Sequence, residues 1–149
     1  MTAKIAQRDV LRVIDANFNR SREGLRVCEE VSRFILRSPA LTGELKCARH
    51  AISTIVKNVS GCRPALAASR DARADIGRTL SIKCATKKKD CLDLFSANIE
   101  RVKESLRVLE EFFSLLDKRG SRRFLMLRFK VYEIEKRALK KIAALRNTR

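Results

Sequence analysis

The sequence predicts an all-α protein, a helical bundle built from two helical hairpins that an irregular connector joins. Two observations predict this fold class. Alternation of apolar and polar residues with a period of two is nowhere sustained, and only two prolines and five glycines interrupt the 149 residues. In addition, "ANFNRSREGLRVCEE" at residues 16–30 is nearly repeated as "ANIERVKESLRVLEE" at residues 97–111. A helical segment that occurs twice predicts a structural unit that occurs twice.

Four segments have the helical spacing of apolar residues, and turn-forming residues separate them. They are expected over about residues 8–37, 41–59, 90–117 and 121–146. The first ends at "SPALTG", the second at "GCRP" and the third at "DKRG", and each of these breaks contains glycine. The short breaks within each pair predict two antiparallel hairpins.

Residues 60–89 lie between the hairpins and show no sustained periodicity, so we expect them to form the irregular connector. The whole chain, residues 1–149, is then expected to be one domain with an internal repeat over 8–59 and 90–146. Two such hairpins usually pack about a pseudo-twofold axis. That axis brings the repeated segments face to face or gives two related pockets.

Composition limits the class of protein. The 34 lysines and arginines against 17 acidic residues give a net charge of +17, which points to a polyanionic partner, to phosphorylated small molecules or to both. The sequence has neither a secretory signal nor an apolar run long enough to cross a bilayer, so we expect a cytoplasmic protein with no membrane partner. The five cysteines form no CxxC pair, so we expect reduced, mostly buried thiols.

Polar side chains interrupt the apolar face of the repeated helix in both copies. They are Asn17, Arg20 and Glu23 in the first copy and Asn98, Arg101 and Glu104 in the second. At about 100° per residue, the Asn and the Arg fall inside the apolar stripe and the Glu at its edge, whereas Arg26 and Glu29 point away. A charge on a buried face must be paired or line a wet cavity. These residues therefore either link the hairpins structurally or line a central polar pocket, and their occurrence in two copies favours the pocket.

Arginine is the residue type available for chemistry in such a pocket. The sequence has no GxxxxGK[ST], GxGxxG or HExxH motif, and its single histidine, His50, does not support a catalytic triad. Fork-shaped guanidinium groups suit phosphate oxygens. The arginines that we expect at the pocket are Arg20, Arg49, Arg70, Arg101 and Arg128.

The segment "SRDARADIGR" adds two carboxylates to this set. Asp71 and Asp75 are four residues apart beside Arg70, and Gly77 permits a tight turn. Paired carboxylates next to a phosphate site suggest Mg²⁺ as a bound ion.

Four blocks of the sequence, in order, resemble the small helical hydroxymethylpyrimidine-phosphate kinase family of thiamin biosynthesis. They are "RVIDANFNRSREGLRVCEEVSRFIL", "LKCARH", "ASRDARADIG" and "ANIERVKESLRVLEEF", and the resemblance covers residues 12–137. It implies an all-helical enzyme that transfers the γ-phosphate of ATP to hydroxymethylpyrimidine phosphate, with ATP and Mg²⁺ as cofactors. The family's domain is also found fused ahead of thiamin-phosphate synthase. Ala72 and Ala74 depart from the family's connector, which has Thr and Gly there.

Within this interpretation each group of candidate residues has a role. The expected catalytic residues are Arg20, Arg101, Asp71 and Asp75, and the two aspartates are also the expected Mg²⁺ ligands. The expected substrate- and phosphate-binding residues are Asn17, Glu23, Arg49, Arg70, Gly77, Asn98, Glu104 and Arg128. The two repeated clusters would each hold one phosphate group, as the two halves of one pocket.

Two other functions stay open. A basic helical bundle that binds nucleic acid fits the net charge, but the absence of tryptophan and the single tyrosine disfavour base stacking. A non-catalytic domain that only binds a phosphorylated pyrimidine fits the changes at Ala72 and Ala74. The expected partners are the phosphorylated pyrimidine, ATP and a separate thiamin-phosphate synthase, and the sequence leaves a homodimer open.

Overall fold

The protein is described by a computed structural model that covers residues 7–59, 61–80 and 87–148. Over these ranges it is all-α and contains no strand, so the predicted fold class is confirmed. The α-helices are α1 (Gln7–Glu30), α2 (Pro39–Lys57), α3 (Cys62–Ser69), α4 (Cys91–Phe113) and α5 (Lys118–Asn147). None of the helices in the described ranges has the length and apolar character that a membrane span needs.

The four predicted helices correspond to α1, α2, α4 and α5, and their ends differ from the prediction by a few residues. The first predicted helix continues beyond α1 as a π-helical segment, η1 (Val31–Ile35), in which the backbone turn is wider. Asp90 and Asp117 fix the starts of α4 and α5, because each side chain accepts hydrogen bonds from two backbone N–H groups of the first turn.

The connector is more regular than predicted, because it contains α3 and a short 3₁₀ turn, η2 (Ile76–Arg78). The side chains that α3 buries are Cys62, Leu66 and Ser69. These positions, spaced by one helical turn, pack across α1 and α2. Residue 60 and residues 81–86 of the predicted connector lie outside the described residues.

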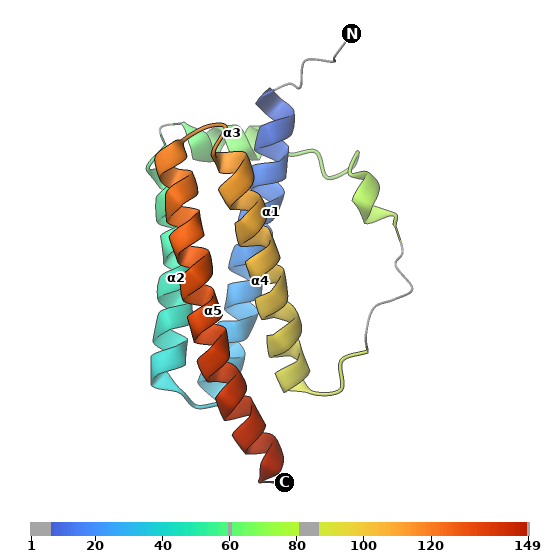
Figure 1. The fold of residues 1–149 in the computed structure, drawn as a ribbon. Helices are drawn as coiled ribbons and strands as arrows, with labels where there is room; N and C mark the ends of the chain where they lie inside the picture. Colours follow the sequence, from blue (N-terminus) through green and yellow to red (C-terminus); the bar gives the residue numbers. More distant parts are fainter. Residues whose placement is uncertain (1–6, 60, 81–86, 149) are drawn as a thin grey trace.

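The four long helices form one bundle in which each helix packs on two neighbours (Figure 1). The order around the bundle is α1, α4, α5 and α2, so the hairpins α1–α2 and α4–α5 lie side by side. The repeated sequences are on α1 and α4, which share the most extensive contact of the fold. Figure 1 also shows α3 lying across one end of the bundle.

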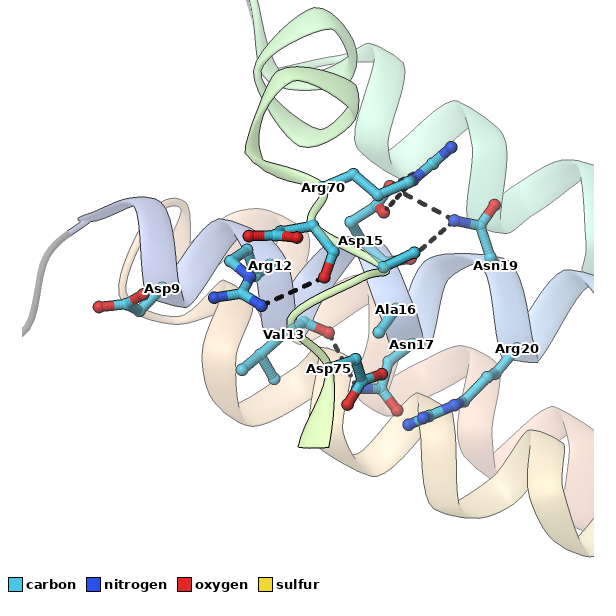
Figure 2. Close-up of a pocket in the computed structure, with 12 residues that line it drawn as sticks. Asp9, Arg12, Val13, Asp15, Ala16, Asn17, Asn19, Arg20, Arg70 and Asp75 are labelled. Atoms are coloured by element: carbon cyan, nitrogen blue, oxygen red, sulfur yellow. Dashed lines mark hydrogen bonds and ion pairs between the residues drawn. The ribbon is translucent and has the colours of Figure 1, made fainter. Parts of the chain in front are cut away.

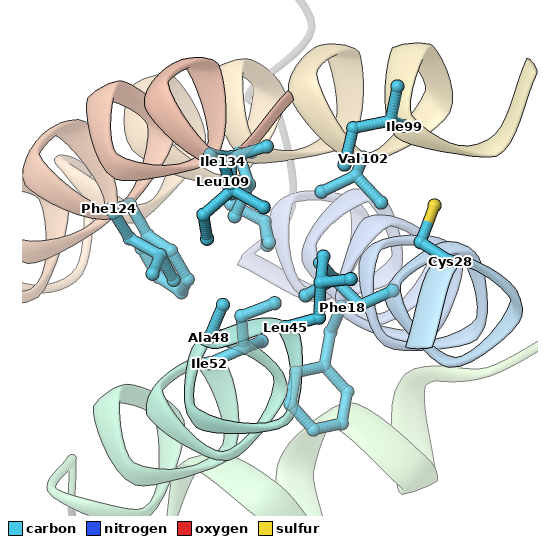
Figure 3. Packing of buried hydrophobic residues seen from close by; sticks show 14 of the residues in the cluster. Phe18, Cys28, Leu45, Ala48, Ile52, Ile99, Val102, Leu109, Phe124 and Ile134 are labelled. Carbon is cyan, nitrogen blue, oxygen red and sulfur yellow. The ribbon is translucent and has the colours of Figure 1, made fainter. Parts of the chain in front are cut away.

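The hydrophobic core lies between these four helices (Figure 3). Its fully buried side chains include Ile14, Leu25, Leu45, Ile52, Phe95, Leu109, Phe124 and Ile134. The rings of Phe113 and Phe124 meet edge to face with centroids 5.1 Å apart. Because burial of each large apolar side chain contributes about 1.5–3 kcal/mol, this core supplies a rigid frame for polar groups on the outer faces.

The helices α1 and α4 approach closely where Gly24 of the first copy meets the second copy. A Cβ atom at residue 24 would lie 2.8 Å from Val102 Cγ2 and 3.0 Å from the backbone oxygen of Asn98. The corresponding residue of α4 is Ser105, which is also buried. Small residues at both equivalent positions therefore permit the close crossing.

We expect Gly24→Ala to lower the free energy of unfolding by about 1–2 kcal/mol, because the new methyl group overpacks the crossing by more than helix propensity recovers. Urea denaturation measures the change. Gly43→Ala is the matched control in α2, where a Cβ would meet nothing within 4 Å, so it should stabilise the protein by up to about 1 kcal/mol. Stabilisation by both substitutions would contradict the close crossing.

The described cysteines divide into two buried and two exposed thiols. Cys28 and Cys62 are buried, whereas Cys47 and Cys91 are exposed. The expectation of mostly buried thiols is therefore wrong for Cys47 and Cys91, while Cys84 lies outside the described residues.

We expect iodoacetamide to alkylate Cys47 and Cys91 in the native protein and to leave Cys28 and Cys62 unmodified until the bundle unfolds. Burial, with the charge of Glu135 as a smaller contribution, raises the pKa of the Cys28 thiol to about 12. Burial also raises the pKa of Cys62. Because the thiolate is the nucleophile, both thiols should be inert as well as inaccessible. Peptide mapping by mass spectrometry checks this, and early modification of Cys28 would contradict it.

Candidate functional site

A cavity of about 580 Å³ lies on the first half of α1, where residues 70–75 pass over the helix (Figure 2). The helix contributes side chains spaced by three or four residues, which therefore share one face. Its polar contributions include Arg12, Asn17 and Arg20. The passing segment contributes Arg70, Asp71 and Asp75. The cavity thus joins the first repeated motif to the connector.

A buried aspartate ties the connector to α1. Arg70 donates two hydrogen bonds to the carboxylate of Asp15, from Nε to Oδ2 at 2.7 Å and from Nη2 to Oδ1 at 2.8 Å. Asn19 Nδ2 donates to the same carboxylate at 3.3 Å. Asp15 is only 5% exposed, and its hydrogen bonds raise the pKa of the Arg70 guanidinium. This two-point contact fixes the chain just before Asp71.

Backbone contacts orient the two connector carboxylates. Asp71 Oδ1 accepts from the N–H of Ala74 at 3.1 Å, and Asp75 Oδ1 accepts from the N–H of Gly77 at 2.9 Å. Arg12 Nη2 donates to the backbone oxygen of Asp71 at 3.4 Å. Within the described part of the chain, the second oxygen of each carboxylate accepts no hydrogen bond. Both carboxylates therefore keep an oxygen for a ligand in the cavity.

Arg12 and Arg20 both lack an acidic partner in the described ranges, and Arg12 donates to the backbone oxygen of Asp71. Arg20 donates no side-chain hydrogen bond within those ranges. Its side chain is exposed and lies with Asn17 and Asp75 at the edge of the site (Figure 2). Asn17 is buried and donates from Nδ2 to the backbone oxygen of Val13 at 2.9 Å. Its amide oxygen is therefore available as an acceptor. The unpaired guanidinium of Arg20 suits an anionic oxygen.

The balance of charge in the cavity suits a phosphate group together with a cation. Arg70 and Asp15 neutralise each other, which leaves two arginines and the carboxylates of Asp9, Asp71 and Asp75. In the described residues, no group of three or more His, Cys, Asp or Glu side chains is arranged to hold a metal ion. A divalent ion here would take one or two carboxylates and complete its shell with phosphate oxygens and water, which is how Mg²⁺ usually binds.

The structure brings together five of the predicted site residues, namely Asn17, Arg20, Arg70, Asp71 and Asp75. Gly77 lies outside the cavity wall and supports it through its hydrogen bond to Asp75. Glu23 is exposed and also lies outside the wall. The residues Asp9, Arg12, Asp15 and Asn19 complete the polar wall and were not predicted. The sequence held one indication that Asp15 is a site residue, because this charged residue directly follows the core residue Ile14.

The second repeated motif does not line this cavity. In the described chain, its wall contains none of the residues Asn98, Arg101 and Glu104, so the expectation of one pocket shared by both copies is not met. Asn98 instead repeats the local contact of Asn17, donating from Nδ2 to the backbone oxygen of Leu94 at 2.8 Å. Arg101 and Glu104 are exposed.

The expectation that Arg49 and Arg128 reach the cavity is wrong. Arg49 Nε donates to Glu29 Oε2 at 3.0 Å, and Arg128 Nε donates to Glu110 Oε2 at 2.9 Å. The sequence also placed Glu29 on the outward face, yet it is only 5% exposed. The reason is that α1 packs on α2 and α3 as well as on α4, so it buries a wider face than its single apolar stripe predicts.

The model of the ThiD2 family matches residues 12–137. The chain belongs to the ThiD2 family. This match confirms the family resemblance seen in the sequence and links the chain to thiamin biosynthesis. No solved structure matches the chain.

Three relatives of this ThiD2 family member are proteins named thiamine-phosphate synthase. The protein of Nostoc sp. (strain PCC 7120) is 38% identical over 132 residues, which is 89% of this chain and 36% of the relative. The protein of Synechocystis sp. (strain PCC 6803) is 38% identical over 126 residues, or 85% of this chain and 35% of the relative. The protein of Rhodopirellula baltica is 34% identical over 125 residues, which is 84% of this chain and 33% of the relative. The chain therefore spans about a third of the length of these relatives.

Proposed function

We propose that the protein is a kinase of thiamin biosynthesis that transfers the γ-phosphate of ATP to hydroxymethylpyrimidine phosphate and gives the diphosphate. The observation that carries the proposal is the cavity on α1, in which the unpaired Arg20 lies with the carboxylates of Asp71 and Asp75. Membership of the ThiD2 family narrows the proposal to thiamin biosynthesis. The pyrimidine substrate rests on the family resemblance alone.

The chemistry of this reaction matches the groups that the cavity holds. A phosphate monoester is already an anionic nucleophile, so the enzyme needs no strong general base. It needs to neutralise charge and to align two polyanions for in-line transfer. In the proposed site Arg12 and Arg20 bind phosphate oxygens, and Asp71 and Asp75 hold Mg²⁺. The bound Mg²⁺ neutralises charge on the phosphate oxygens of ATP.

The fixed contacts of the cavity supply the alignment. The clamp of Asp15 on Arg70 and the hydrogen bond of Gly77 to Asp75 hold the connector segment before any ligand binds. Preorganised groups stabilise a transition state because they do not have to reorient during the reaction. The buried Asn17 offers its amide oxygen as an acceptor for an N–H donor of the substrate.

The length of the relatives supports a proposed partner. Because the chain matches about a third of proteins named thiamine-phosphate synthase, we assign the kinase activity to the matched third and the synthase activity to the remainder. A thiamine-phosphate synthase is then the proposed partner for this chain, and its substrate would include the diphosphate made here.

The test is direct turnover. Purified protein with Mg²⁺ and ATP is incubated with hydroxymethylpyrimidine phosphate, and mass spectrometry follows the diphosphate and ADP. We expect both products in equal amounts and no product when EDTA removes Mg²⁺. No turnover at high protein concentration, while an established kinase for this substrate works in the same buffer, would leave only the binding function.

A further inference from the structure

The internal repeat places a second cavity on α4. This cavity, of about 620 Å³, is lined by the start of α4, by Lys87–Lys89 just before it and by Arg146 from the end of α5. The α4 side chains that line it are Asp90, Asp93, Ser96 and Ala97. By the offset of the repeat they correspond to Asp9, Arg12, Asp15 and Ala16, which all line the first cavity. The two cavities therefore occupy equivalent places on the two repeated helices.

The carboxylates of the second cavity already accept hydrogen bonds from groups of the protein. Asp90 Oδ1 accepts the N–H groups of Leu92 and Asp93, each at 2.9 Å. Asp93 Oδ2 accepts the backbone N–H of Lys89 at 2.9 Å, and its Oδ1 accepts from Arg146 Nη2 at 2.9 Å. These contacts lower the pKa of Asp93, with the Lys89 N–H as the largest cause. The oxygens of Asp90 and Asp93 are thus engaged in contacts within the protein.

The lysines of this cavity have no such partners. In the described ranges no acidic side chain pairs with the ammonium groups of Lys87, Lys88 or Lys89, and all three are exposed. Three neighbouring ammonium groups repel one another, and an anion at the cavity relieves that repulsion. The second cavity differs from the first in this respect, because the first keeps carboxylate oxygens free beside its arginines.

The two cavities are separate, because they share no lining residue and are built on different helices. The helices α1 and α4 run in opposite directions, so their first turns lie at opposite ends of the bundle (Figure 1). A ligand in the second cavity therefore contacts a different set of residues from a ligand in the first. This site goes beyond the proposed kinase function.

We propose that the second cavity binds a compact polyphosphate anion without a metal ion. Lysine ammonium groups act as point charges and do not impose the planar geometry of a guanidinium fork, so the site selects for charge density and not for one shape. Three unpaired ammonium groups suit a chain of two or more phosphates better than one phosphate. The ligand is either free pyrophosphate or the phosphate chain of a nucleotide.

Equilibrium dialysis with labelled inorganic pyrophosphate, in the presence of EDTA, tests this site. We expect saturable binding that weakens by about tenfold or more when Lys87, Lys88 and Lys89 are changed together to Gln, because three charge-assisted contacts are lost. The matched control changes Lys57, Lys130 and Lys141 to Gln, which removes the same charge from exposed positions outside both cavities. Equal weakening in the two triple variants would show non-specific attraction and overturn the proposal, as would unchanged binding in the first.

Competition identifies the ligand. Displacement of pyrophosphate by ATP at a lower concentration than by unlabelled pyrophosphate assigns the site to a nucleotide, and the reverse order assigns it to the free anion. If AMP displaced labelled pyrophosphate as effectively as ATP or unlabelled pyrophosphate does, the proposal that the site binds a polyphosphate would be overturned. Circular dichroism of each variant checks that the bundle is folded. Because the experiment measures binding in the presence of EDTA, its result does not depend on whether the protein has kinase activity.

Discussion

Arg20→Lys is expected to lower kcat/KM by about a hundredfold while the fold and its stability persist. Arg20 lines the first cavity, is exposed and pairs with no acidic side chain in the described residues, so the substitution leaves no buried group without a partner. Lysine keeps the charge but loses the two-point contact to a phosphate, which acts where charge develops in the transition state. Steady-state kinetics measures the loss, and thermal unfolding with and without Mg²⁺-ATP measures lost ligand stabilisation.

Arg26→Lys is the matched control on the same helix. Arg26 is exposed, pairs with Glu30 at 2.6 Å and lies outside the cavity, so its substitution should leave both activity and ligand stabilisation unchanged. Arg101→Lys tests the second copy of the motif. Because Arg101 does not line the cavity, we expect a smaller effect than at Arg20. Equal losses in Arg20→Lys and Arg26→Lys would contradict the assignment of the cavity.

Arg70→Ala is expected to destabilise the protein more than Asp15→Asn does, although the two residues form one ion pair. The difference follows from what remains after each change. Without Arg70, the carboxylate of Asp15, which is buried in the intact protein, has lost its charged partner. Without the Asp15 charge, Arg70 is half-exposed and turns to water. Urea denaturation of both variants gives the order.

Both substitutions should also release the segment that carries Asp71 and Asp75. We expect the Mg²⁺ concentration for half-maximal activity to rise by about tenfold, as when a residue that orients a metal ligand is lost. Asp15→Glu is a partial rescue, since it restores the charge at the cost of geometry. A larger stability loss in Asp15→Asn than in Arg70→Ala, or an unchanged Mg²⁺ requirement in both, would contradict the role of the clamp.

Local sequence signals were sufficient for the four long helices and their pairing into hairpins. The spacing of residues such as Ile14, Phe95 and Phe124 defines the buried faces of the long helices, and the breaks between segments define the hairpins. The repeat left open either one shared pocket, which was preferred, or two related pockets, and the structure has a separate cavity on each of α1 and α4. The short "SRDARADIGR" segment supplied the connector side of the first cavity, because its charged residues are adjacent in the chain.

Contacts between distant residues could not be read in the same way. Arg49 is one of many arginines, and only the packing of α2 on α1 shows that it forms an ion pair with Glu29. The pairing of Asp15 with Arg70 was equally hidden from the sequence. Arg70 directly follows α3, and that helix was not predicted because the connector is polar. The apolar stripe of a helix predicts only the face that packs on its main neighbour. Helix α1 packs on α2, α3 and α4, and these contacts also bury some of its polar positions.

A crystal structure of the protein with Mg²⁺ and a non-hydrolysable ATP analogue tests whether the cavity on α1 is the nucleotide and metal site. We expect the metal ion on the carboxylates of Asp71 and Asp75 and the terminal phosphates on Arg20, with Arg70 still bound to Asp15. A nucleotide whose phosphates lie on Lys87–Lys89 alone, with the cavity on α1 free of metal and phosphate, would contradict it.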